Sequence, residues 1–386
     1  MPTRRARQVA GATAGLLLGL GAASPAHASA THPAVVHVHA GHPGSTDRTS
    51  RTALTGRIAR TVHTVRPGQS IQQAVDGARP GDTVLVLPGT YRESVQITTS
   101  DLTLRGAEGL SVITPAPAGA TGSAAACARA GHGICVTGAE GKRLTGVRIE
   151  SLTVSGFPKN GLSASQTDGM TVRHVLAEKN GEQGISQEKS IRGRFLDNES
   201  RGNGQSGIFL ANIADGKGGA IDTEGAQVSG NRLTGNRIGV VVRRLRDLVV
   251  EHNTITGNCG GVFVVGDDGR PRAGDLTVRQ NTVDRNNQYC APNDRLPYIQ
   301  GTGIVLTGVE QTRVTDNEVL DNVGASPLSG GIVLFRSYVG GLSADNTISA
   351  NTAKGNGPAD LADRDGGPDN TFSGNTCRVS EPAGRC

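Results

Sequence analysis

Residues 248–265 read LVVEHNTITGNCGGVFVV, and this stretch decides the fold. Three aliphatic positions or runs, at 248–250, 255 and 262–264, are separated by Asn253 and Asn258, the second of which is followed by Gly260 and Gly261. Each run is too short for a helix and ends at residues that favour turns. The segment therefore predicts three short strands joined by two sharp corners.

The same pattern recurs through the second half of the chain, where all 20 asparagines lie at or after Asn160. The motif N-x4-N recurs, and six of its copies lie at Asn198/Asn203, Asn231/Asn236, Asn253/Asn258, Asn281/Asn286, Asn317/Asn322 and Asn351/Asn356. A glycine and an aliphatic strand follow most copies, at intervals of 23, 23, 32, 22, 42 and 28 residues. Three strands in a base period of 22 to 23 residues predict an all-β, right-handed parallel β-helix of roughly ten turns.

The repeated asparagines predict a structural ladder along one corner of the helix. An amide side chain both donates and accepts, so equivalent asparagines about 4.8 Å apart can bond from rung to rung. Asparagine also tolerates the left-handed backbone conformation of tight corners. We assign Asn198, Asn231, Asn253, Asn281 and Asn317 to this ladder.

The composition agrees with a solenoid. Of 386 residues, 56 are glycine and none is tryptophan, and apolar residues make up 35%, which suits a narrow core that runs along a stack of repeats. The net charge of +5 falls to +2 without Arg4, Arg5 and Arg7 of the leader, which argues against a polycationic nucleic-acid binder. We expect a monomer.

The chain begins with three features of an exported protein. Residues 1–28 combine arginines, an apolar run too short to span a bilayer and small residues at the end, as a signal peptide does. Residues 29–61 form a predicted flexible linker that contains His32, His37, His39 and His42, and residues 62–386 form the β-helix domain. We expect a secreted, extracellular protein with no membrane span, and a copper or zinc carrier using the histidines is a lesser alternative.

Six cysteines in an exported chain favour disulfides. Sequence proximity suggests Cys127–Cys135 and Cys377–Cys386, and the repeat places Cys259 and Cys290 on neighbouring rungs. Metal binding by these thiols is disfavoured because the chain lacks CxxC pairs.

The first rungs carry motifs of their own. Residues 70–78 predict a short amphipathic helix, with Ser70 and Gln73 as a capping box, that closes the open end of the coil. The stretches GQSIQQAV at 68–75, GDTV at 81–84 and PGTY at 88–91 resemble the entry of the right-handed parallel β-helix proteins of the pectin-lyase-like superfamily. That resemblance covers about residues 62–386 and implies the fold, whereas its members include lyases, hydrolases, epimerases, sugar-binding proteins and adhesins.

The signatures of two activities within that superfamily are missing. The motifs of polygalacturonase-like hydrolases are out of order or absent, because Gly131-His132-Gly133 precedes Asp267-Asp268. The Asp-Pro-His triplet of alginate epimerases does not occur. We therefore expect a protein that binds or processes an extracellular polysaccharide, with uronate lyase as one candidate activity. A non-catalytic adhesin or structural β-helix protein is the alternative.

A lyase needs a base for the α-proton and cations for the uronate carboxylate. The repeat register places charged residues at one edge of the Gly-aliphatic strands. We assign Arg243 as the candidate base and Asp267 and Asp268 as candidate partners of a Ca²⁺ ion, the only candidate cofactor. The candidate substrate-binding residues are Arg244, Arg246, Arg270 and Arg336, and Asp215 lies at the same edge.

The same strands predict an outward apolar stripe. Alternation points one set of aliphatic residues inward and leaves the residues between and after them outside: Phe209, Val241, Phe263, Val265, Val305, Val333 and Phe335. Such a stripe is either covered by loops or used by a ligand. The segments 212–226 and 288–300 are the candidate covers, and a stripe of Phe and Val suits a polyanionic sugar poorly.

Overall fold

The computed structural model describes residues 60–116, 124–139, 141–213 and 218–386. These belong to one compact unit, Ile58–Cys386, and the unit Met1–Arg57 is not described. The predicted signal peptide and the four linker histidines lie outside the described residues, so the metal-carrier alternative stays a prediction. Among the helices of the described part, none has the length and apolar character needed to cross a bilayer.

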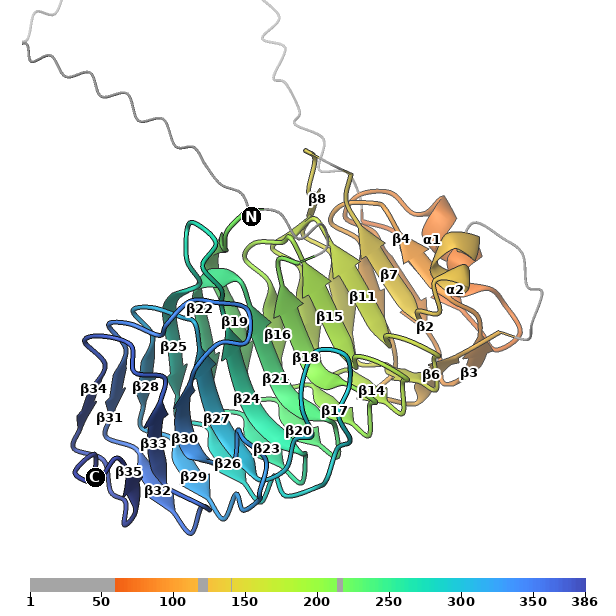
Figure 1. The fold of residues 1–386 in the computed structure, drawn as a ribbon. Helices are drawn as coiled ribbons and strands as arrows, with labels where there is room; N and C mark the ends of the chain where they lie inside the picture. The colour runs from red at the N-terminus through yellow and green to blue at the C-terminus, as the bar shows by residue number, and fades with distance from the viewer. Residues whose placement is uncertain (1–59, 117–123, 140, 214–217) are drawn as a thin grey trace, which may run out of the picture. The chain divides into compact units, whose positions relative to one another are not determined.

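Three long parallel sheets, here called A, B and C, make up the unit (Figure 1). Sheet A consists of β1 (Val62–Val65), β2 (Thr83–Val86), β5 (Thr103–Arg105), β9 (Arg148–Glu150), β13 (Thr171–Arg173), β16 (Arg194–Leu196), β19 (Ile221–Ser229), β22 (Leu245–Glu251), β25 (Gly274–Arg279), β28 (Arg313–Thr315), β31 (Thr347–Ser349) and β34 (Thr371–Ser373). Sheet B consists of β3 (Gly89–Arg92), β6 (Ser111–Thr114), β10 (Thr153–Ser155), β14 (Leu176–Glu178), β17 (Glu199–Arg201), β20 (Arg232–Thr234), β23 (Thr254–Thr256), β26 (Thr282–Asp284), β29 (Glu318–Leu320) and β32 (Thr352–Lys354). Sheet C consists of β4 (Val95–Ile97), β7 (Ile134–Thr137), β11 (Leu162–Ser165), β15 (Ile185–Glu188), β18 (Ser206–Ala211), β21 (Ile238–Arg243), β24 (Gly260–Val265), β27 (Thr302–Thr307), β30 (Gly330–Phe335), β33 (Leu361–Arg364) and β35 (Ser380–Glu381).

Each turn visits the sheets in the order A, B, C, and each strand pairs in parallel with the equivalent strand one turn away. The stretch at 248–265 supplies most of one such turn, β22, β23 and β24. The predicted parallel β-helix is confirmed. A further pair, β8 (Leu144–Thr145) and β12 (Thr167–Asp168), forms a small separate sheet.

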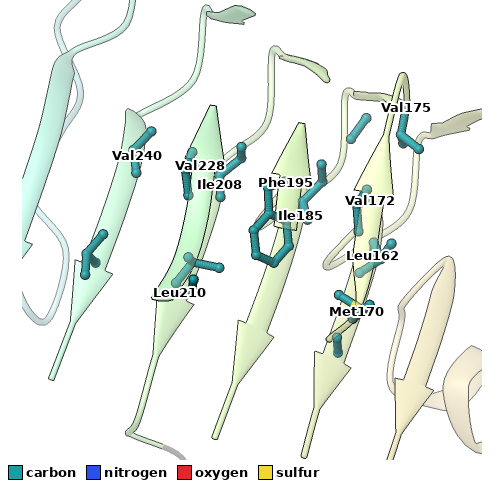
Figure 2. Close-up of a cluster of buried hydrophobic side chains, with 14 of the residues drawn as sticks. Leu162, Met170, Val172, Val175, Ile185, Phe195, Ile208, Leu210, Val228 and Val240 are labelled. Atoms are coloured by element: carbon teal, nitrogen blue, oxygen red, sulfur yellow. The ribbon is translucent and has the colours of Figure 1, made fainter. Parts of the chain in front are cut away.

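The core is a column of aliphatic side chains enclosed by the three sheets. Figure 2 shows Leu162, Ile185, Ile208 and Val240 on successive strands of sheet C, with Phe195 among them. All five are fully buried. Because every rung adds a few such residues, burial of apolar area accumulates along the stack without a wide core.

Two asparagine ladders run along the corners. The first, between sheets A and B, contains the five asparagines that we assigned and continues to Asn351 and Asn375. Each Nδ2 donates to the Oδ1 of the next rung at 2.9 to 3.0 Å. The second ladder, between sheets B and C, runs from Asn180 to Asn356 and ends on the carboxylate of Asp360.

The left-handed corner residues are not the asparagines, contrary to our expectation. The residue before each asparagine takes the positive φ, as at Asp197, His252 and Gln280, with φ of 54°, 54° and 53°. The asparagine itself turns its amide inward, where it also donates to a strand carbonyl, for example from Asn253 to Val228 at 3.0 Å. The corner thus divides backbone strain and hydrogen bonding between two neighbouring residues.

The glycine at the second position of β18, β21, β24, β27 and β30 in sheet C is required by close contact with neighbouring atoms. A Cβ on Gly261 would lie 2.5 Å from the carbonyl oxygen of Gly303 and 2.5 Å from Cγ1 of Val283. Gly239 and Gly303 face the same kind of contact with the next rung. These positions exclude any side chain, which explains the repeated Gly-aliphatic motif.

The helix α1 (Ile71–Gly77) caps the first rung, as the sequence predicts. Ser70 Oγ accepts from the amide of Gln73 at 3.2 Å. The reciprocal group is Glu93 rather than Gln73, because the Glu93 carboxylate accepts from the amides of Ile71 and Gln72. A second short helix, α2 (Ala125–Arg129), was not foreseen.

Three disulfides join Cys127 to Cys135, Cys259 to Cys290 and Cys377 to Cys386. The pairing is the one that the spacing and the repeat suggest, and the described residues include no free cysteine. Disulfides persist in oxidising compartments, so the chain is of extracellular or periplasmic type.

Candidate functional site

The outward face of sheet C carries an apolar floor across five strands. Phe209, Val241, Phe263 and Val305 are neighbours in register on β18, β21, β24 and β27, and Val333 follows on β30. They form a second apolar cluster, separate from the column inside the helix. The alternation of the strands places them outside, as the sequence predicts.

The loop between β26 and β27 covers part of this floor. Ile299 is fully buried on the cluster, and Leu296 and Cys290 pack against it. Leu328, between β29 and β30, adds a contact that the sequence did not reveal. The other expected cover, residues 212–226, does not pack on this floor with its described alanines, because Ala220 and Ala226 pack into the main core inside the helix. This part of the expectation is wrong because β19 continues sheet A from Ile221.

Two cross-links hold the covering loop in place. The disulfide from Cys259 fastens Cys290 at the start of the loop. The guanidinium of Arg237 donates to the carbonyls of Ala291 at 2.6 Å and Pro297 at 3.4 Å. Its burial lowers the pKa of Arg237. The disulfide and Arg237 therefore hold the loop between β26 and β27 in position over sheet C.

A cavity of about 510 Å³ remains between the loop, the sheet and residues 337–339. Its floor is apolar, from Phe209, Val241, Phe263, Val305 and Phe335. Its walls carry polar and charged groups: Gln183, Gln205, Asn293, Asp294, Arg295, Ser337 and Tyr338. A mostly apolar hollow with a few polar groups is the usual form of a small-molecule site.

Arg243 stands at the edge of this cavity, at the last residue of β21. Its backbone is flanked in register by Ala211 and Val265. Within the described residues, its side chain forms no hydrogen bond or ion pair, which leaves a half-buried guanidinium facing the cavity. Burial, and next the charge of Arg295, lower the pKa of Arg243, while Asp267 opposes this shift.

Asp267 does not line the cavity, because it is used within the fold. Its Oδ2 lies 3.2 Å from Nε of the buried Arg244, and its Oδ1 accepts from the amide of Gly269 at 2.9 Å. Arg244 also donates to the carbonyl of Gly218. The two charges therefore neutralise one another.

The other candidate residues are spread over several elements. Arg246 lies on β22 of sheet A and contacts Glu310 at 2.9 Å. Asp268, Arg270 and Arg336 are exposed and are not among the residues that line the cavity. Asp215 lies outside the described residues. Of the residues that we assigned from the sequence, the structure places only Arg243 in the cavity wall.

The residues present do not form a calcium site at this edge. Both oxygens of Asp267 have partners, and Asp268 is exposed beside Gly340. In the described part of the chain, no group of three or more His, Cys, Asp or Glu side chains is placed to hold a metal ion. We derive no step through Ca²⁺.

Sequence reasoning missed most of the cavity wall. Asn293, Asp294 and Arg295 lie in the segment that lengthens one repeat to 42 residues, and this length was the only signal. Tyr338 follows β30 and packs against Phe335, with ring centroids 5.4 Å apart and the ring planes tilted by 53°. Burial raises the pKa of Tyr338.

Comparison with known families identifies the repeat. The model described as "Right handed beta helix region" matches residues 123–283 and 215–337, which together span more than half of the chain. No curated protein sequence matches the chain at a significant level.

Solved structures with the same fold include three enzymes. The A-module of mannuronan C-5 epimerase AlgE6 of Azotobacter vinelandii is 18% identical, covers 81% of this chain and 90% of its own, and has a TM-score of 0.52. The periplasmic alginate epimerase AlgG is 12% identical over 82% of this chain and 84% of its own, also at 0.52. An alginate lyase from Paenibacillus sp. str. FPU-7 is 13% identical over 83% of this chain and 99% of its own, at 0.50. At these identities the likeness shows the fold.

Proposed function

Because the chain belongs to the right handed beta helix family, its sheets are platforms on which particular side chains decide function, and we propose that it is a secreted protein that binds and processes a uronate-containing polysaccharide. The site is the cavity on sheet C. The observation that carries the proposal is the half-buried guanidinium of Arg243, without an ionic partner in the described residues, beside an apolar floor.

The cavity suits one uronate unit better than a long polyanion. Arg295 offers two parallel N–H groups that match a carboxylate. The phenyl rings of Phe209 and Phe263 offer an apolar surface to the C–H face of a sugar ring. Gln183, Gln205 and Asn293 offer hydrogen bonds to hydroxyl groups. A run of further carboxylates would meet the apolar floor, which disfavours them.

The same groups support proton transfer. Two cations are available, and we assign Arg295 to neutralise the uronate carboxylate and Arg243 to take the α-proton. The lowered pKa of Arg243 is the direction that a base requires. In a lyase reaction the α-proton goes to Arg243, the β carbon–oxygen bond breaks toward the leaving sugar, a carbon–carbon double bond forms, and water protonates the leaving oxygen. Three enzymes with solved structures of this fold are named as mannuronan or alginate epimerases or as an alginate lyase, which supports uronate chemistry at a site on this fold.

The test is an activity and binding screen of the purified full chain. Polymannuronate, polyguluronate, polygalacturonate and neutral dextran are offered, and the ultraviolet absorbance of unsaturated uronates is followed. We expect turnover of one uronate polymer and no binding of dextran. Arg243→Ala should abolish turnover, and Arg243→Lys should retain binding with weaker turnover, because the lysine amine is a base that differs in shape and reach from the guanidine group.

Arg313→Ala is the matched control, since Arg313 is exposed on β28 of sheet A and its side chain has no hydrogen-bond or ionic partner among the described residues. Turnover that survives Arg243→Ala would overturn the catalytic assignment. Binding without turnover in the wild-type protein would favour the non-catalytic adhesin.

A further inference from the structure

A second feature lies on a different sheet, near the first rungs. Two adjoining hollows of about 510 and 480 Å³ lie along the outer face of sheet A and share Arg148, Glu150 and Arg173. We call them together the basic trough. The arginines that line it are Arg60, Arg105, Arg148, Arg173, Arg192 and Arg194.

The strand register explains why these arginines gather. Arg148 on β9 and Arg194 on β16 both pair in register with Thr171 of β13, so they stand in one outward row two rungs apart. Arg105 and Arg173 flank Glu150 in the neighbouring row. With about 4.8 Å between strands, the row presents a positive charge about every 10 Å.

The carboxylates of the trough do not neutralise it. Glu150 is buried and contacts Arg105 at 3.0 Å and Arg173 at 4.0 Å. Arg192 forms ion pairs with Asp168 and Glu224, which neutralise its charge. The other five arginines face two lining carboxylates, Asp101 and Glu150, which leaves an excess of positive charge.

Arg148 and Arg194 are two cations of this surface without an ionic partner. Both are exposed, and within the described residues neither forms an ion pair or a side-chain hydrogen bond. An arginine held on a strand with no partner is a charge available to a ligand. Since the chain without its three leader arginines carries only +2, the excess is a property of this face rather than of the whole surface.

We propose that the basic trough binds an anionic polysaccharide that carries carboxylate or sulfate groups. Threonine hydroxyls of Thr83, Thr103 and Thr171 lie between the arginines and suit sugar hydroxyls. The lining contains no aromatic residue, so the bases of a single-stranded nucleic acid find no stacking platform. The preceding residues 29–59 cannot neutralise it, because they carry Asp47 against Arg48, Arg51 and Arg57.

This site is independent of the cavity on sheet C and extends beyond its function. A polymer held on sheet A anchors the protein to an acidic matrix, while the cavity on sheet C handles a single unit. Charged surfaces of this kind give binding that weakens steeply with salt.

The experiment measures binding of the full chain to polygalacturonate, dextran sulfate, neutral dextran and DNA at about 50 and about 200 mM salt. We expect the wild-type protein to bind one or both acidic polysaccharides and not neutral dextran. Arg148→Gln combined with Arg194→Gln should raise the dissociation constant at least about tenfold, because each removes one charge-assisted contact. Unfolding temperatures should stay at the wild-type value, since neither side chain has a partner to lose.

Arg313→Gln is again the control, because Arg313 belongs to the same sheet far from the trough, and it should leave binding unchanged. The proposal fails if the wild-type protein binds neither acidic polysaccharide, or if it binds DNA as tightly as the polysaccharides. It also fails if the double variant binds like the wild-type protein, or if Arg313→Gln weakens binding as much as the double variant does. Arg243→Ala should leave this binding intact, so failure of the cavity assignment and failure of the trough are separate outcomes.

Discussion

Replacing Asn253 by alanine tests the first asparagine ladder. The side chain is 1% exposed and makes four hydrogen bonds. Its Oδ1 accepts from the amide and from Nδ2 of Asn231, each at 2.9 Å. Its Nδ2 donates to Val228 O at 3.0 Å and to Asn281 Oδ1 at 2.9 Å.

Four groups lose a hydrogen bond in Asn253→Ala, and two of them keep other side-chain or backbone partners. Asn231 Nδ2 keeps Phe195 O and Ser229 O, and Asn281 Oδ1 keeps the amide of residue 253. The amide of Asn231 is left without its partner, and the carbonyl of Val228 loses its side-chain donor but keeps its place in the strand ladder. At about 1–3 kcal/mol for each buried unsatisfied group, we expect a loss of about 3 kcal/mol. With an unfolding entropy of about 2 cal/mol/K per residue over ~320 residues, this lowers Tm by about 5 °C.

The assay is differential scanning calorimetry together with urea unfolding. Asn287→Ala is the control, because Asn287 follows a ladder residue yet lies outside both ladders and is only half-buried. We expect it to cost about 1 kcal/mol or less, since water can replace its bonds. An Asn253→Ala protein that unfolds at the wild-type temperature, or no lower than Asn287→Ala, would refute the ladder as a source of stability.

Three further predictions follow from the fold. Non-reducing peptide mapping should recover Cys127–Cys135, Cys259–Cys290 and Cys377–Cys386, and a free thiol or another pairing would contradict the rung assignment. Gly261→Ala should prevent folding of its rung, because the added Cβ would collide with the carbonyl oxygen of Gly303. Gly257→Ala, at a φ of 65° with open space around it, should lower the free energy of unfolding by about 1–2 kcal/mol. Soluble yield and Tm of the two variants are compared, and equal values would refute the contact argument. The pKa of Asp82 is lowered to about 2, first by the hydrogen bond with His63 and then by the amides of Arg79 and Thr61. The ionised carboxylate therefore stabilises the fold above about pH 4, and this contribution is lost as pH falls toward 2. Unfolding midpoints should therefore fall over that range more steeply in wild type than in Asp82→Asn, and parallel curves would show that this carboxylate contributes nothing.

The repeat made the framework predictable. Strand order, the first asparagine ladder and the pairing of Cys259 with Cys290 follow from residues at a fixed period, because each rung contacts mainly its neighbours. The position of Arg243 at the end of a strand followed from the same register.

The walls of the cavity could not be derived in this way. Residues 293–296 and 337–339 lie in insertions whose paths depend on tertiary packing against the apolar floor. The sequence also placed Arg243, Arg244 and Arg246 at one edge. The chain turns at Arg244, with φ of 55°, so Arg246 belongs to sheet A and Arg244 is buried against Asp267.

The direction of the second ladder has a consequence for building longer versions of this protein. Every amide in it donates toward the C-terminal end, and the last acceptor is Asp360, which has no amide to donate onward. Its other oxygen accepts from the amides of Arg378 and Val379 in the closing segment. Duplicated turns can therefore be inserted upstream of Asp360, where each new asparagine finds both neighbours. Turns appended after Asp360 would begin on a carboxylate that cannot donate a hydrogen bond. Extra turns should therefore fold when they are inserted before Asp360 and fail to fold when they are added after it.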